Sequence, residues 1–102
     1  PYPAPLIIRM MEKHPLGSQL FMPLHGHPYL VAVAAAGERV ESQDLNVFLA
    51  EGDQGVNFYP GTWHHPLLVL SGKQDFLVID RGGAGENLIE YDLHSPLVLA
   101  LD

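Results

Sequence analysis

Residues 55–67 read GVNFYPGTWHHPL, and this stretch decides the fold. It opens with alternating apolar and polar side chains, as a half-buried β-strand does. Pro60 and Gly61 then predict a turn, because proline presets φ at the first central position and glycine tolerates the positive φ that the second often needs. His64 and His65 follow at the start of the next strand. Neighbouring strand residues point to opposite faces, so these two imidazoles can share one site only if a bulge intervenes.

The composition is that of a small acidic globular protein, which we expect to form a single domain over residues 1–102. Hydrophobic residues make up 47% of the chain and charged residues 17%, a balance that disordered chains do not show. The net charge of −7 argues against nucleic-acid binding, which needs clustered Lys and Arg. The absence of cysteine excludes disulfides, thiol catalysis and cysteine-ligated zinc.

No apolar run in the sequence approaches the length of a membrane-spanning helix, and the first residues show no signal-peptide pattern. We therefore expect a cytoplasmic protein that binds a small molecule and neither nucleic acid nor membrane.

The rest of the chain reads as short strands separated by turns. No window carries a convincing helical period, and turn signals recur about every eight to twelve residues, as in all-β sandwiches and barrels. The apolar run Tyr29–Ala36 predicts a strand that is buried on both faces. The expected strands are Leu6–Met11, Gln19–Pro23, Tyr29–Ala36, Leu45–Leu49, Val56–Tyr59, Trp63–Leu70, Gln74–Asp80, Leu88–Tyr91 and Leu97–Leu101.

Two motifs resemble those of the small β-barrels called cupins. They are Glu12-x-His14-x4-Gln19-x6-Gly26 and Gly61-x-x-His64. The cupin motifs read His-x-His, three or four residues, Glu, six residues, Gly, and then Gly-x-x-His. The spacing is kept here, with Glu12 in place of the first His and Gln19 in place of the Glu. The resemblance implies an antiparallel cupin-like β-barrel (a double-stranded β-helix or jelly roll) whose mouth holds Glu12, His14, Gln19 and His64.

Alternation along a strand also puts Glu12 and His14 on one face, where they can converge with a residue across the ladder. Two imidazoles, a carboxylate and the amide of Gln19 are a ligand set for a divalent metal such as Ni or Zn, with Mn and Fe as further candidates. The alternative is a metal-free pocket in which His14 and His64 are hydrogen-bonded structural or catalytic residues. The residues leave both readings open.

A second resemblance covers three longer blocks. They are EKHPLGSQLFMPL (residues 12–24), DQGVNFYPGTWHHPL (residues 53–67) and DFLVIDRGG (residues 75–83). Together they are similar to the ureidoglycolate lyase family, also called ureidoglycolate hydrolase, in family order and with family-like spacing. Members carry a further N-terminal region that this chain lacks. The resemblance implies a homodimeric carbon–nitrogen lyase of allantoin and purine degradation, which splits ureidoglycolate into glyoxylate and urea.

The reacting carbon of ureidoglycolate bears a hydroxyl, a carboxylate and a ureido nitrogen. Its breakdown needs a base for the hydroxyl proton, an acid for the departing nitrogen, and a cation or N–H cluster for the carboxylate. His14 or His64 suits the base, because imidazole titrates near neutral pH. The other candidate residues are Gln19 and Asn57 for the ureido group, Tyr59 as proton donor or pocket wall, and Lys13, His65 and Arg81 for substrate binding.

Several alternatives stand beside these assignments. Arg81 can instead form a salt bridge to Asp75 or Asp80, and Trp63 is expected in the core or at an interface. The whole chain can also be a metal-dependent cupin enzyme of another class, such as an isomerase or dioxygenase, or a non-catalytic binding or dimerisation module. We expect His25, His27 and His94 to be exposed to solvent.

Overall fold

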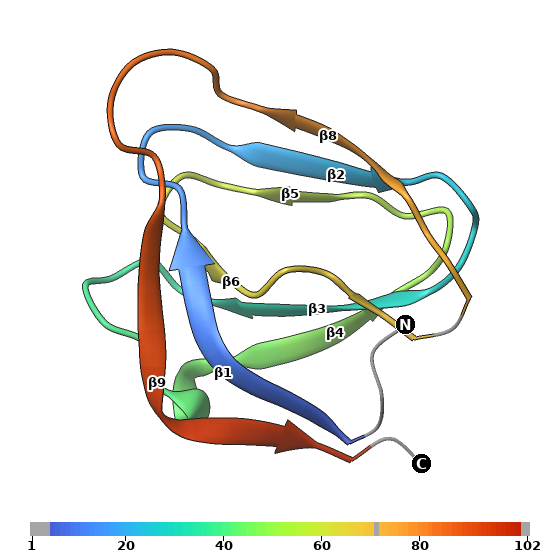
Figure 1. Cartoon of the computed structure of the whole chain (residues 1–102), viewed down its shortest axis with the longest axis horizontal. Coiled ribbons are helices and arrows are strands. Elements are labelled where there is room, and N and C mark those ends of the chain that lie inside the picture. The colour runs from blue at the N-terminus through green and yellow to red at the C-terminus, as the bar shows by residue number, and fades with distance from the viewer. Residues whose placement is uncertain (1–4, 71, 101–102) are drawn as a thin grey trace.

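A computed structural model describes residues 5–70 and 72–100, which form an all-β molecule (Figure 1). Its elements are β1 (Leu6–Lys13), β2 (Gln19–Pro23), β3 (Tyr29–Ala34), the 3-10 helix η1 (Ser42–Asp44), β4 (Asn46–Ala50), β5 (Val56–Phe58), β6 (Trp63–His64), β7 (Leu68–Val69), β8 (Phe76–Asp80) and β9 (Ile89–Leu99). No helix in these residues is long and apolar enough to cross a membrane.

The strands form two antiparallel sheets. The first has the order β4-β3-β6-β1-β9, with β7 also paired to β3, and the second has the order β5-β2-β8. Figure 1 shows β5, β2 and β8 running side by side along the top of the molecule. The expected all-β antiparallel class is confirmed. Within the described ranges no strand pairing joins the two sheets, so the cupin-like architecture is a sandwich and the barrel is not closed by hydrogen bonds.

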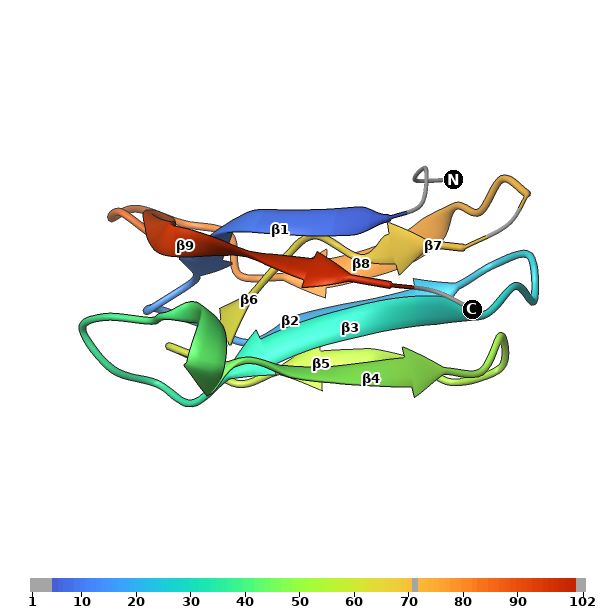
Figure 2. The same cartoon turned by 90° about the horizontal axis from the view of Figure 1, so that it is seen from below.

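Strand β3 lies at the centre of the molecule, between β1 and β9 on one side and β4 and β5 on the other (Figure 2). Leu30, Ala32 and Ala34 pack into one hydrophobic cluster, whereas Tyr29 and Val31 pack into a second. The strand is therefore buried on both faces, as its unbroken apolar run predicts. The strand is shorter than predicted, because its pairing with β6 ends at Ala34 and the two alanines that follow are exposed.

The prediction of one strand over Trp63–Leu70 is wrong, because a bulge divides it into β6 and β7. His64 pairs with Val33 and Leu68 pairs with Leu30, so four steps along this segment face three along β3. One residue is therefore extra, which is the definition of a bulge. The proline at position 66 has no N–H to give to the ladder, which favours the interruption there.

The prediction of two short final strands is also wrong, because β9 is one strand of 11 residues with an irregularity inside it. Ile8 pairs with Leu97 and Met10 with Asp92, so two steps along β1 face five along β9. The irregularity changes which face β1 presents. Ile8 and Met11 pack into the same cluster although they lie three residues apart, a spacing that a regular strand puts on opposite faces. The neighbours of Met11 in sequence are thereby turned toward the other side of the sheet.

Candidate active site

A carboxylate and two imidazoles meet where β1 pairs with β6. Glu12 lies directly opposite His64 in the ladder, and His14 follows Glu12 by two residues. One ligand atom from each of the three side chains lies within 4.8 Å of the others. Glu12 Oε1 is 4.0 Å from His64 Nδ1, and the two imidazole centroids are 5.2 Å apart. The convergence expected from the spacing of the two motifs is therefore present.

The turn at Pro60 and Gly61 holds these two segments together. Gly61 has a φ of +80°, the left-handed conformation for which glycine is suited. Its backbone N–H donates to the carbonyl oxygen of His14 at 3.0 Å. The turn thus ties His14, near the start of the first motif, to Gly61 at the start of the second, and the residue that needs positive φ is the glycine that the sequence supplies.

His64 is the only polar or charged side chain buried in the core of the described residues, with 2% of its surface exposed. Its ring stacks on Phe58 with centroids 4.1 Å apart and planes 5° from parallel. Burial, and secondarily the neighbouring His14, lowers the pKa of His64 to about 4. The imidazole is therefore neutral at pH 7, and neither ring nitrogen has a hydrogen-bond partner among the described residues.

His14 has one engaged nitrogen and one unengaged nitrogen. Its Nδ1 lies 2.6 Å from the backbone carbonyl oxygen of Asn87, whereas its buried Nε2 has no partner in the described part of the chain. Glu12 is half-buried, and burial is the main cause that raises the pKa of its carboxyl, with Glu90 adding a smaller contribution in the same direction. These shifts favour the neutral forms of both Glu12 and His64.

The cluster opens into a cavity of about 430 Å³. Glu12, His64 and His65 supply polar walls, and the three rings of Phe21, Phe58 and Phe76 are among its apolar walls. His64 and His65 line the same cavity because of the bulge between β6 and β7. As expected from the sequence, two adjacent strand residues share a site only where such a bulge is present. Over residues 5–70 and 72–100, neither a Lys nor an Arg lines this cavity.

The donor set fits a divalent metal ion. A carboxylate and two neutral imidazoles are ligands that Zn and Ni accept, and the unengaged ring nitrogens of His14 and His64 are buried where a ligand would satisfy them. Gln19, the fourth candidate ligand, donates its amide N–H to Asp80 at 3.3 Å, and its side-chain oxygen is buried without a partner in the described residues.

The two basic candidates are engaged outside the cavity. Lys13 Nζ donates to the carbonyl oxygen of Gly37 at 2.7 Å and lies 4.5 Å from the Trp63 ring centroid. Arg81 donates to the carbonyl oxygen of Ala84 at 3.0 Å, and the described residues show no ion pair between it and an aspartate. The structure does not bring either cation to the imidazoles.

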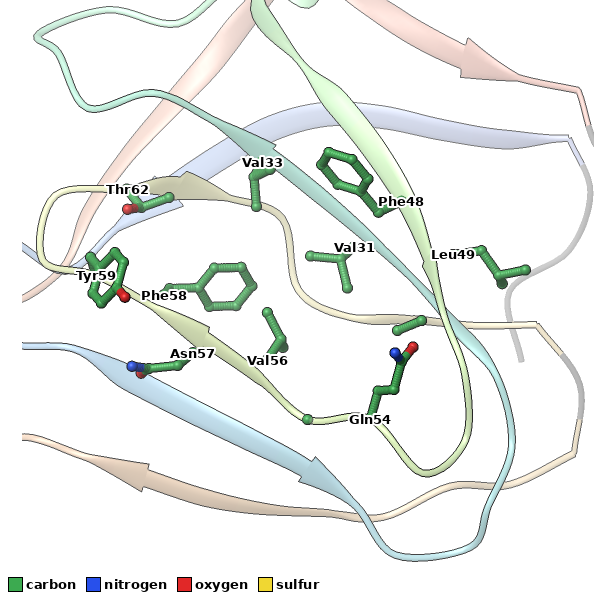
Figure 3. Close-up of a pocket in the computed structure, with 12 residues that line it drawn as sticks. Val31, Val33, Phe48, Leu49, Gln54, Val56, Asn57, Phe58, Tyr59 and Thr62 are labelled. Atoms are coloured by element: carbon green, nitrogen blue, oxygen red, sulfur yellow. The ribbon is translucent and has the colours of Figure 1, made fainter.

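Tyr59 and Asn57 line a different cavity, of about 390 Å³, which lies between β3, β4 and β5 (Figure 3). Tyr59 is 74% exposed there, beside the exposed apolar side chains of Phe48 and Leu49. Phe58 lines both cavities and stands between the two groups. The assignment of Tyr59 as a proton donor beside the histidines is therefore not supported by its position.

Of the remaining predictions for aromatic and histidine residues, most are confirmed and one is wrong. Trp63 is fully buried in the first hydrophobic cluster and its indole N–H donates to Gly37 at 3.0 Å, so its core placement is confirmed. His25 and His94 are exposed as expected, whereas the prediction for His27 is wrong because it is half-buried.

Two contacts of the site were not anticipated from the sequence. The stack of Phe58 on His64 joins residues from different sheets, and the partner of His14, Asn87, lies 73 residues away in the chain. Periodicity along one strand carries no information on either contact. An asparagine after a glycine-rich loop gives only a weak turn signal.

Comparison with known proteins gives one consistent family. The family model described as ureidoglycolate lyase matches residues 1–100. The chain is 48% identical over 100 residues to the ureidoglycolate lyase of Pseudomonas syringae pv. syringae, covering 98% of this chain and 59% of that protein. It is 54% identical over 89 residues to the enzyme of Azotobacter vinelandii, covering 87% and 54% of the two chains. It is 49% identical over 98 residues to that of Stutzerimonas stutzeri, covering 96% and 58%. The chain thus spans a little over half the length of these curated relatives.

Proposed function

Because the chain belongs to the ureidoglycolate lyase family, we propose that its cavity eliminates urea from ureidoglycolate and releases glyoxylate. The observation that carries this proposal is the cluster of Glu12, His14 and His64, of which Glu12 and His64 line the cavity. Ureidoglycolate is small enough for this space, and its breakdown needs proton acceptors and donors of the kind that the three side chains provide. The relatives are named for this activity over longer chains, and the match covers 59% of the Pseudomonas syringae pv. syringae protein.

The reaction balances without water. A base removes the hydroxyl proton, the oxygen electrons form the carbonyl of glyoxylate, and the bond from carbon to the ureido nitrogen breaks. That nitrogen keeps the bonding electron pair and takes a proton, so urea leaves as a neutral molecule. One proton is taken and one is returned, which makes the reaction a lyase reaction.

The proton acceptor is an imidazole. His14 and His64 both have a ring nitrogen that no described residue engages, and His64 is neutral because burial lowers its pKa to about 4. The same low pKa makes His64 a weak base, since the most effective base has a pKa near the operating pH. The proton donor is Glu12, whose carboxyl has a raised pKa and lines the same cavity.

The proposal has a second form with a divalent metal, in which Glu12, His14 and His64 would be ligands and not the proton donor and acceptor. When bound, it supplies a Lewis acid that can chelate the substrate hydroxyl and carboxylate together. The substrate carboxylate otherwise depends on His65 and on backbone N–H groups, because no Lys or Arg lines the cavity within the described ranges. The apolar walls exclude water and strengthen whichever of these contacts is made.

We extend the proposal to a cytoplasmic homodimer, as the family resemblance implies. The second cavity supports an interface, because Phe48, Leu49 and Tyr59 are 58, 57 and 74% exposed around it. Exposed apolar groups that are contiguous mark protein contacts more often than isolated ones do. Light scattering coupled to gel filtration tests this, and a monomer at micromolar concentration would remove the dimer from the proposal.

The decisive experiment incubates the purified protein with racemic ureidoglycolate and measures glyoxylate against a blank without enzyme. We expect release that His64→Ala abolishes. His94→Ala is the matched control, because the same residue type is removed from an exposed position on β9. Release that His64→Ala leaves unchanged would remove His64 from the mechanism, and no release from the wild-type protein would refute the proposed activity.

A second function is favoured by one observation, the metal-ligand geometry of Glu12, His14 and His64. It is a metal-dependent cupin reaction of another class, such as isomerisation or oxygenation. Elemental analysis of protein purified without a histidine tag separates the two. Stoichiometric iron together with no glyoxylate release would favour the alternative, because mononuclear iron held by two histidines and a carboxylate is typical of oxygenases.

A further inference from the structure

The segment that connects β8 to β9 lies along the loop that follows β1. We call residues 80–87 the strap, because they run past residues 14–19 from one end to the other. The contacts along it, in order, are Gln19 with Asp80, Gly17 with Arg81, Leu16 with Gly85, and Leu16 and His14 with Asn87. The strap therefore follows the loop that carries His14 and Gln19 over its whole length.

The approach of the two segments is close. A Cβ placed on Gly17 would lie 2.7 Å from the Cβ of Arg81, and one placed on Gly85 would lie 3.0 Å from Cδ1 of Leu16. Gly85 also has a φ of +102°, a conformation that side-chain-bearing residues rarely adopt. Gly17 in the loop and Gly85 in the strap thus allow the two segments to lie against each other.

Asn87, at the end of the strap, makes two hydrogen bonds to this loop. Its side-chain oxygen accepts the backbone N–H of Leu16 at 2.8 Å. Its backbone carbonyl oxygen lies 2.6 Å from Nδ1 of His14. A carbonyl can only accept, so this contact requires a hydrogen on Nδ1. The neutral ring therefore carries its proton on Nδ1 and leaves Nε2, the buried nitrogen without a partner, as a free lone pair.

From this geometry we infer that Asn87 is the positioning residue that selects the tautomer of His14 and so leaves Nε2 as the nitrogen that His14 offers to the cluster with Glu12 and His64. The side chain fixes the strap to the backbone of Leu16, and the strap in turn holds the carbonyl against the imidazole. The kinetic consequence of this inference rests on the proposed function. The tautomer itself does not depend on that function.

The two imidazoles are held in different ways. His64 is held by its stack on Phe58. His14 is held by a hydrogen bond to a carbonyl oxygen that lies 73 residues away in the chain. A ring whose lone pair is fixed in one direction before the substrate arrives needs less reorganisation in the transition state.

The test is long-range ¹H–¹⁵N correlation NMR of the histidine rings in the metal-free protein, combined with steady-state kinetics. We expect His14 of the wild type to show a protonated Nδ1 and an unprotonated Nε2. Asn87→Ala should give averaged nitrogen signals for His14 and lower kcat by about fivefold to tenfold, with KM changed less, as the loss of one positioning hydrogen bond predicts. Asn87→Asp keeps an acceptor for Leu16 and should retain the wild-type tautomer.

Glu86→Ala is the matched control, because it truncates an exposed neighbour in the strap. If Asn87→Ala does not fold, Asn87→Ser replaces it, since serine is too short to keep the same reach. A wild-type His14 protonated on Nε2 would overturn the inference, as would a variant spectrum and kcat that match the wild type. A changed spectrum with an unchanged kcat would overturn the role in catalysis. If the protein releases no glyoxylate at all, the proposed function fails, and the nitrogen spectra still decide whether Asn87 selects the tautomer.

Discussion

The burial of His64 makes the stability of the protein depend on pH in a way that one substitution can isolate. The folded protein keeps this imidazole neutral, with a pKa of about 4 against an ordinary value of 6.5. Between these two values the unfolded chain binds a proton that the folded protein does not, so the free energy of unfolding falls as the pH falls. The contribution is fully present above pH 6.5 and is lost as the pH approaches 4.

The size of the effect follows from the same shift. A displacement from 6.5 to about 4 corresponds to about 3 kcal/mol of stability lost between pH 7.5 and pH 4, a large part of the stability of a small domain. Glu12 acts in the opposite direction, because its pKa is raised in the folded protein and its protonation on acidification favours the fold. The net pH dependence of the wild type is therefore smaller than the contribution of His64 alone.

His64→Asn removes the titrating group, and guanidinium unfolding at pH 7.5 and pH 4 measures the change. The drop in unfolding free energy on acidification should be smaller in the variant than in the wild type by about 3 kcal/mol. His94→Asn, on the exposed surface of β9, should leave the wild-type drop in place. Equal drops in the wild type and His64→Asn would refute the reasoning, because they would show that burial does not hold the imidazole neutral.

Three further predictions concern packing and the metal site. Trp63→Ala should lower the unfolding free energy by about 3–5 kcal/mol in guanidinium titrations, because the indole is fully buried, and a loss under about 1 kcal/mol would contradict its place in the core. Gly52→Ala should lower the melting temperature, because the new Cβ would lie 1.9 Å from a backbone carbonyl oxygen. Gly82→Ala is the control and should not lower it, because no atom lies within 4 Å of that Cβ. Equal melting temperatures of the two variants would show that the chain accommodates the added methyl group at Gly52. Glu12→Gln should weaken Zn or Ni binding in calorimetry by about tenfold or more, because it replaces the one anionic ligand of the cluster, and unchanged affinity would place the metal elsewhere.

The parts of the fold that depend on local chemistry could be predicted from the sequence. The turn at Gly61 has the positive φ that a glycine after proline suggests, and the unbroken apolar run of β3 is buried on both faces. The meeting of Glu12 and His64 was also expected, because the cupin-like spacing placed them on neighbouring strands. In each case the signal lay in a few adjacent residues or in one motif.

The parts that depend on register between distant strands could not be predicted. The interruption at His65 and the irregularity between Ile8 and Met10 each arise from how many residues face the partner strand, which no pattern within one strand records. For the same reason, the positions of Tyr59 and Asn87 could not be predicted from the sequence. Tyr59 comes next to a site residue in sequence and lies at another cavity, whereas Asn87 lies 73 residues from His14 and touches it.

These two irregularities assemble the chemistry of the site. The irregularity between Ile8 and Met10 shifts the face of β1, so that Met11 packs in the core with Ile8 and Glu12 lines the cavity. The interruption at His65 lets His64 and His65, which a regular strand would separate, line that same cavity. A regular sheet with the same residues would keep Glu12, His14 and His64 on one face but would turn that face toward Ile8 in the core, and it would put His65 on the other side. The spacing of the motif is therefore not sufficient to build this site, because the extra residues in β9 and after β6 decide which side chains reach the cavity.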